Sequence, residues 1–249
     1  MRTARKKEDR SPGGTARLIG LSDGLFATVL TLLVLDLRIP EAVGAAAAGS
    51  FQKWIGPHLF SYLLTFLVSG TYWMAHHRDF DHIVRQDRTV LSYNLLFLLF
   101  IGLLPFTTAT IGQTDFSGGS FPFYWAMYSV NIACAGVTLT VTWLYALRHG
   151  LVEKTIPRGE SRRIIARQVL IPVVFLVSIA TEAAAPKAFL GPYTLLAMAP
   201  GLLLVDRLFH VERTPQPLGV GRQLTELLWR AGTVLPWLLI IGLAWYVAA

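Results

Sequence analysis

Residues 17–38 read RLIGLSDGLFATVLTLLVLDLR, and this stretch decides the class of fold. The hydrocarbon core of a bilayer is roughly 30 Å thick, and an α-helix needs about 20 mostly apolar residues to cross it. A strand of a membrane barrel is shorter and alternates apolar with polar residues, which this stretch does not. It therefore predicts a membrane-spanning helix.

The composition extends this prediction to the whole chain. Of 249 residues, 53% are hydrophobic and 15% are charged, whereas soluble domains carry roughly 25% charged residues. The mean hydropathy of +0.51 is too high for one soluble core to hide the apolar side chains. We therefore expect an all-α, polytopic integral membrane protein embedded in a lipid bilayer, and the composition excludes an ordinary soluble enzyme.

Apolar runs of suitable length recur along the chain, separated by charged residues, Pro or Gly. They are Leu18–Leu37, Pro57–Ala75, Val90–Ile111, Phe121–Ala146, Ile164–Ala185, Gly191–Leu208 and Leu224–Val247. The last is the least certain, because Glu226 and Arg230 occupy its first turns. The expected organisation is a disordered basic N-terminus over 1–16, a six-helix domain over 17–210, and a loop with an extra hydrophobic segment over 211–249.

The basic residues predict the orientation of the chain in the membrane. With the N-terminus in the cytoplasm, 19 of the 22 Lys and Arg residues fall on the cytoplasmic side. An excess of Lys and Arg in cytoplasmic loops is typical of multi-pass proteins. We therefore expect a cell-membrane protein with a cytoplasmic N-terminus. The same distribution argues against nucleic acid as a partner.

The first run carries a polar stripe that lipid alone does not explain. Thr28 and Thr31 lie near one face of the expected helix, and Leu32 and Leu35 continue that face. Asp36 follows at the end. The alternative is that both threonine hydroxyls only bond to carbonyl oxygens one turn earlier in the helix.

A second polar group is expected at the cytoplasmic end of the first two helices. Ser22 and Asp23 follow Arg17 in the first helix, and the second ends in YWMAHHRDFDH at residues 72–82. An aspartate near the membrane needs hydrogen-bond donors. The available donors are Arg17, Trp73, and one of the adjacent histidines, His76 or His77. His77 and Asp81 have the spacing of a metal-ligand pair, but the chain's six histidines are too few and too scattered for us to expect a metal site.

Glu182 is the remaining acidic residue near an apolar run. We expect it to be hydrated near the outer membrane surface. The alternative is that Glu182 and the cytoplasmic-side histidines bind protons or ions in a secondary or proton-coupled transporter.

Three blocks of sequence in the first three runs resemble the bacterial branch of the transmembrane protein 175 family of potassium-permeable channels. They are RxxxLSDG with TLLVLD, SYLLTFxxxGTYWxxHHR, and NLLFLLFIGLLPF, which together cover residues 17–110. Leu21 stands where the family usually has an aromatic residue.

The resemblance implies a homotetramer that conducts potassium in preference to sodium, with no catalysis and no cofactor. Each subunit would contribute its first helix to a central pore, whose narrow part lies at Thr28, Thr31, Leu32 and Leu35. Thr28 departs from the Ile or Leu that relatives usually carry, so Leu32 or Leu35 is the expected barrier. Asp36 would form an acidic ring at the external mouth.

The resemblance also implies a gating or structural network that braces the first helix against the second. Its expected members are Arg17, Ser22, Asp23, Trp73 and His77, with His76 as the alternative to His77.

Overall fold

The computed structural model describes residues 13–35, 37, 48–114, 119–185, 190–209 and 242. Every regular element within these ranges is helical, and the one β-type contact is an isolated bridge between Ile83 and Val152. The all-α fold predicted from composition is therefore confirmed.

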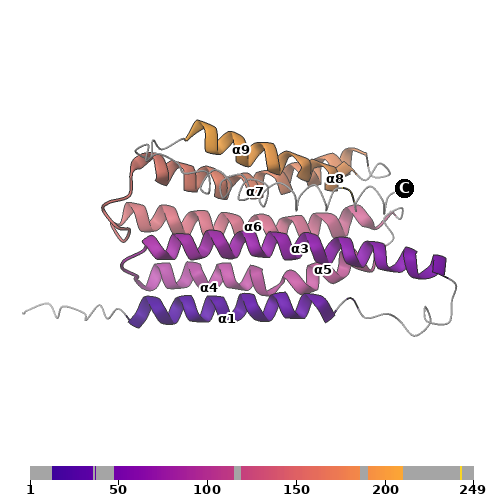
Figure 1. Cartoon of the computed structure of the whole chain (residues 1–249), viewed down its shortest axis with the longest axis horizontal. Helices are drawn as coiled ribbons and strands as arrows, with labels where there is room; N and C mark the ends of the chain where they lie inside the picture. Colours follow the sequence, from indigo (N-terminus) through magenta and orange to yellow (C-terminus); the bar gives the residue numbers. More distant parts are fainter. Residues whose placement is uncertain are drawn as a thin grey trace, which may run out of the picture.

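The long helices lie side by side with roughly parallel axes, with α1 at one edge of the bundle and α9 at the other (Figure 1). The elements are α1 (Gly13–Leu35), α3 (Ala48–His82), α4 (Arg88–Gly102), α5 (Leu104–Gly112), α6 (Phe121–Arg148), α7 (Arg158–Ala184), α8 (Leu190–Tyr193), a 3₁₀ helix (Thr194–Ala197) and α9 (Met198–Leu208). Helix α1 contacts α3, α4 and α5, while α6 packs on α4, α5 and α7.

Four segments are long and apolar enough to cross a membrane, and each coincides with an expected run. They are Ala16–Leu35, Arg88–Gly112, Phe121–Arg148 and Arg158–Ala184. The multi-pass character predicted from the sequence is therefore confirmed.

Helix α3 is longer and more polar than the run Pro57–Ala75 that predicted it. Several of its polar residues lie on one face at spacings of three, four or seven positions and are buried inside the bundle: Ser61, Thr65, Ser69, His76 and Asp79. Thr65 shows why they are tolerated, because its hydroxyl lies 2.8 Å from the Thr108 hydroxyl and 3.0 Å from that of Tyr128. Buried polar groups are stable when hydrogen-bonded in this way, and here the bonds join α3 to α5 and α6.

Two expected runs are interrupted. The run Val90–Ile111 divides at Leu103, where α4 ends and α5 begins, because Pro105 has no N–H to donate to the carbonyl four residues earlier. The run Gly191–Leu208 is not one helix as expected. It consists of α8, the 3₁₀ turn and α9, and Pro200 in the first turn of α9 likewise cannot donate to the carbonyl of Leu196.

Helix α1 begins at Gly13, four residues before the expected start of the six-helix domain at residue 17. Residues 1–12 lie outside the described residues, as does the expected seventh run Leu224–Val247 apart from residue 242.

The loop that follows α3 and the loop that follows α6 are joined by backbone hydrogen bonds, and we call this contact the loop clasp. The backbone N–H groups of Val84 and Arg85 donate to the carbonyl of Leu151 at 3.0 and 3.2 Å, and Glu153 donates to His82 at 3.0 Å. Asp87 caps α4 by accepting from the N–H of Val90 at 2.9 Å. The clasp fixes the end of α3 that carries the candidate network residues.

Candidate functional site

The stripe expected to face the ion pathway is exposed on a single chain. Thr28, Thr31, Leu32 and Leu35 all lie on the open side of α1, and Leu32 and Leu35 are 45% and 48% exposed. The opposite face buries Leu18, Ser22, Phe26, Val29 and Leu33. The stripe therefore faces away from the other described helices of the chain.

The open face of α1 also carries small residues at its first turns. A Cβ atom added at Gly20 or Gly24 would meet nothing within 4 Å. Of the four membrane-span candidates, α1 has the smallest share of its apolar window buried, 28%. The described part of the chain therefore leaves this helix largely uncovered.

Both threonines of the stripe donate hydrogen bonds to carbonyl oxygens one turn earlier in the helix, as the alternative explanation of their presence requires. The Thr28 hydroxyl donates to the Gly24 carbonyl at 2.9 Å, and the Thr31 hydroxyl donates to the Thr28 carbonyl at 2.8 Å. These bonds use the hydroxyl protons. Each hydroxyl oxygen keeps lone pairs on the exposed face, and an oxygen lone pair is what coordinates a cation.

The expected contact between the first two helices forms at Asp23. The indole N–H of Trp73 donates to Asp23 Oδ1 at 2.9 Å. The ring of His77 stacks on Trp73 with centroids 5.5 Å apart, and His77 pairs with Asp81 at 3.8 Å. These residues form an outer, partly exposed layer of the network.

A second layer of the network is buried and involves His76 instead of His77. The amide of Asn94 donates to the Ser22 hydroxyl at 3.2 Å, and its carbonyl oxygen lies 2.8 Å from His76 Nε2. The His76 ring stacks between Phe80 and Phe97, at 4.3 and 5.5 Å. The two histidines, considered as alternatives from the sequence, therefore occupy different layers.

Asn94 is the network residue that the sequence reasoning missed. A single asparagine directly before the apolar run LLFLLFIG was a usable signal, because polar residues within a membrane span usually face protein. Its side chain links α1 to α3 through α4.

Arg17 does not join the network within the described part of the chain. Its side chain is exposed on the second turn of α1 and forms no hydrogen bond or ion pair with Asp23 or Trp73 there. Asp36, expected to form an acidic ring, lies outside the described residues.

Glu182 differs from the sequence expectation. It is 1% exposed, so the prediction that it is hydrated is wrong. Its Oε2 accepts from the N–H of Gly191 at 2.7 Å, and its Oε1 has no hydrogen-bond partner among the described residues. The break between α7 and α8 folds Gly191 back over the carboxyl group, which a sequence pattern does not reveal.

Candidate metal ligands do not gather among the described residues. No three His, Cys, Asp or Glu side chains there are placed to hold a metal ion together. The pair of His77 and Asp81 stands by itself.

Comparisons with known proteins agree with the motifs in the first three runs. Residues 17–105 match the sequence model of the family described as endosomal/lysosomal potassium channel TMEM175. A protein named potassium channel from Streptomyces collinus is 29% identical over 136 residues, which cover 55% of this chain and 66% of that protein. The human protein named endosomal/lysosomal proton channel TMEM175 is 27% identical over 204 residues, covering 80% of this chain and 40% of that one.

A solved structure supports the fold over a longer part of the chain. The crystal structure titled as a lysosomal potassium-selective channel TMEM175 homolog from Chamaesiphon minutus superposes with a TM-score of 0.59 at 22% identity. The match covers 80% of this chain and 97% of that one. The resemblance drawn from the motifs is confirmed, and the helical bundle is the fold of a solved channel.

Proposed function

We propose that this chain, whose residues 17–105 carry the sequence of the TMEM175 channel family, forms a potassium-permeable channel in the cell membrane. The relatives are named as channels, which are not an enzyme class. The proposed activity is passive conduction of potassium in preference to sodium, with no cofactor, and with potassium as the permeant ion.

One observation carries the proposal: the polar and apolar stripe of α1 is exposed on the single chain. One helix face cannot enclose a pathway, but four copies related by a closed symmetry axis can. In such a homotetramer the exposed faces of four α1 helices would surround a central pore. Thr28 and Thr31 would present hydroxyl oxygens to the ion, and Leu32 and Leu35 would form the constriction.

The constriction is expected at the leucines because apolar rings gate by excluding water. At Thr28 the pore would be lined by hydroxyl groups, which exclude water less than an apolar ring does. Its proton is held by the Gly24 carbonyl, so its lone pairs are available to a passing cation. Asp36 remains a candidate for concentrating cations at the outer mouth.

The network at the other end of α1 would position the pore helix. Two layers tie α1 to α3: Asp23 to Trp73, and Ser22 through Asn94 to His76. We assign these residues a structural or gating role, because none of them belongs to the exposed stripe of Thr28 to Leu35.

Flux through purified protein in liposomes tests the proposal. We expect potassium flux to exceed sodium flux and to rise without saturation. Leu35→Ala should change the conductance or the ratio of the two fluxes. Leu176→Ala is the matched control, because Leu176 is a similarly exposed leucine on α7, away from the stripe. If substitutions at Leu35, Leu32 and Thr31 all leave flux unchanged, α1 does not line the pathway.

A proton-coupled transporter is the second candidate, and the buried carboxyl group of Glu182 favours it. One oxygen of this buried carboxyl group has no hydrogen-bond partner among the described residues, and buried carboxyl groups of this kind relay protons in membrane transporters. Flux that saturates, requires a proton gradient and is abolished by Glu182→Gln would support this candidate against the channel. Proton flux is measured in the same liposomes, because the human relative is named a proton channel.

A further inference from the structure

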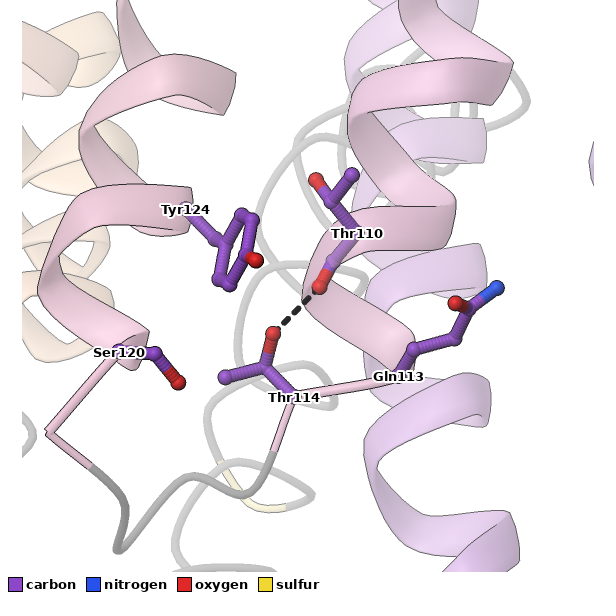
Figure 2. A pocket seen from close by; sticks show the side chains of 5 residues that line it. All are labelled: Thr110, Gln113, Thr114, Ser120 and Tyr124. Atoms are coloured by element: carbon purple, nitrogen blue, oxygen red, sulfur yellow. Dashed lines mark hydrogen bonds between the residues drawn. The ribbon is translucent and has the colours of Figure 1, made fainter.

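A polar pocket lies where α5 ends and α6 begins. It has a volume of about 280 Å³ and is lined by Thr110, Gln113, Thr114, Ser120 and Tyr124. Figure 2 shows Tyr124 and Ser120 on the α6 side facing Thr110 and Thr114 on the α5 side, with Gln113 turned away. None of the five carries a formal charge.

The pocket lies at a membrane surface. Thr110 is in the last turn of the span Arg88–Gly112 and Thr114 follows that span, while Ser120 immediately precedes the span Phe121–Arg148. By the expected orientation this is the outer surface. Lipid headgroups lie at this depth, so the pocket is within reach of a bound phospholipid.

Two of the lining hydroxyls are fixed as acceptors. The Thr110 hydroxyl donates to the Thr107 carbonyl at 2.8 Å, and the Thr114 hydroxyl donates to the Thr110 carbonyl (dashed line, Figure 2). Because each proton is used, only oxygen lone pairs remain for a ligand. These positions favour a ligand group that donates hydrogen bonds.

The other two hydroxyls are free to donate. Within the described part of the chain, the side chains of Ser120 and Tyr124 have no hydrogen bond. A phosphate oxygen is a strong acceptor for such hydroxyls. The pocket thus has acceptors on the α5 side and donors on the α6 side, and the ligand that matches it has an ammonium group beside a phosphate.

An apolar stripe leads to the pocket along α4 and α5. Leu95, Leu99, Leu103 and Phe106 recur every three or four residues and are 50%, 55%, 41% and 62% exposed. Phe106 lies one helical turn before Thr110, on the same face of α5. An acyl chain along this stripe would bring its headgroup to the pocket.

We propose that this pocket binds the headgroup of a phospholipid with a primary ammonium group, whose acyl chain lies along the stripe of Leu95 to Phe106. The five described lining residues are neutral, which matches a zwitterion with no net charge, while an anionic headgroup would find no cationic partner among them. A trimethylated ammonium, as in a choline lipid, has no N–H to donate to Thr110 and Thr114. Phosphatidylethanolamine is therefore the matching lipid. The proposal does not depend on the pore assignment.

Native mass spectrometry of the delipidated full chain in detergent tests the proposal. The probes are phosphatidylethanolamine, phosphatidylcholine and phosphatidylglycerol with identical acyl chains. We expect retention of the ethanolamine lipid to exceed that of the choline lipid by about fivefold, which corresponds to one hydrogen bond. Thr110→Val with Thr114→Val should reduce it to the level of the choline lipid.

Thr71→Val is the matched control, because the half-buried Thr71 also donates to its own helix, at the Leu67 carbonyl, but lies outside the pocket. If the threonine variants do not fold, Tyr124→Phe with Ser120→Ala removes the donors instead and should lower retention of the ethanolamine lipid. Equal retention of the ethanolamine and choline lipids would overturn the proposal. So would stronger retention of phosphatidylglycerol, or the same loss in Thr71→Val.

Discussion

The indole N–H of Trp73 donates to the carboxylate of Asp23 at 2.9 Å, and this bond joins the exposed end of α3 to the helix that carries the candidate ion pathway. Both side chains are partly exposed, so water competes for the bond. In the buried interior next to it, Asn94 also connects α1 to α3, because it bonds to both Ser22 and His76. Breaking the partly exposed layer should therefore lower the free energy of unfolding by less than breaking the buried layer.

The Trp73 to Asp23 bond is measured by a double-mutant cycle. Asp23→Ala and Trp73→Phe each remove one partner, and we expect a coupling free energy of about 1 kcal/mol between them. The measurement is thermal unfolding of the purified protein in detergent. Strictly additive effects would mean that the bond contributes nothing to stability. Asp23→Asn keeps an acceptor oxygen and should cost less than Asp23→Ala.

Asn94→Leu should be more damaging than either outer-layer change. It leaves His76 Nε2 and the Ser22 hydroxyl without their shared partner in a buried site, which costs about 2 kcal/mol. The expected result is a lower unfolding temperature together with altered flux, since α1 loses its buried anchor. Ser92→Leu, an exposed hydroxyl two residues earlier whose bond stays within α4, serves as control.

Gly136→Ala should destabilise the bundle by overpacking. A Cβ at Gly136 would lie 2.5 Å from Pro172 Cγ and 2.6 Å from the Tyr72 hydroxyl, which donates to the Ile132 carbonyl. Forced shifts of this kind typically cost about 1–3 kcal/mol. Gly70→Ala is the control, because nothing lies within 4 Å of its added Cβ and alanine favours a helix. Unfolding temperatures should fall for Gly136→Ala and stay level or rise for Gly70→Ala.

Acid should weaken the loop clasp through Asp87. Partial burial alone would raise the pKa of this carboxyl group, but the N–H of Val90 and the hydroxyl of Tyr145 lower it below its ordinary value. A carboxyl group with a lowered pKa in the folded state stabilises the fold above its unfolded pKa, and that contribution is lost as the pH falls through the folded pKa. The effect should therefore appear below about pH 4.

Asp87→Asn provides the comparison for the acid effect. Asparagine keeps the helix cap but does not titrate. When the pH falls from about 5 to about 3, the variant should therefore lose less stability than the wild-type protein. Identical pH profiles of the unfolding temperature would remove Asp87 as the cause.

Glu182→Gln separates the two candidate functions. The amide oxygen can still accept from the Gly191 N–H, so the fold should persist with little change in unfolding temperature. For a channel lined by α1, potassium flux in liposomes should be unchanged. Loss of flux in a correctly folded variant would favour the transporter.

The sequence predicted those features that depend on chain composition and on spacing within one helix. The apolar runs at residues 18–37 and 121–146 were recognisable because lipid requires a long, continuous apolar surface. The stripe from Thr28 to Leu35 followed from helical periodicity, and the need of a carboxylate for a donor identified Trp73 as one of several candidate partners for Asp23. Each of these has a local cause.

Only the tertiary structure decided which polar residues meet across helices. It placed His76 and His77 in separate layers, brought Asn94 between Ser22 and His76, and folded Gly191 back over Glu182. These contacts join residues between 9 and 72 positions apart in the chain. Their geometry depends on how the helices rotate and pack against one another. Spacing along the sequence determines which residues share a face of a helix, but not which other helix packs against that face.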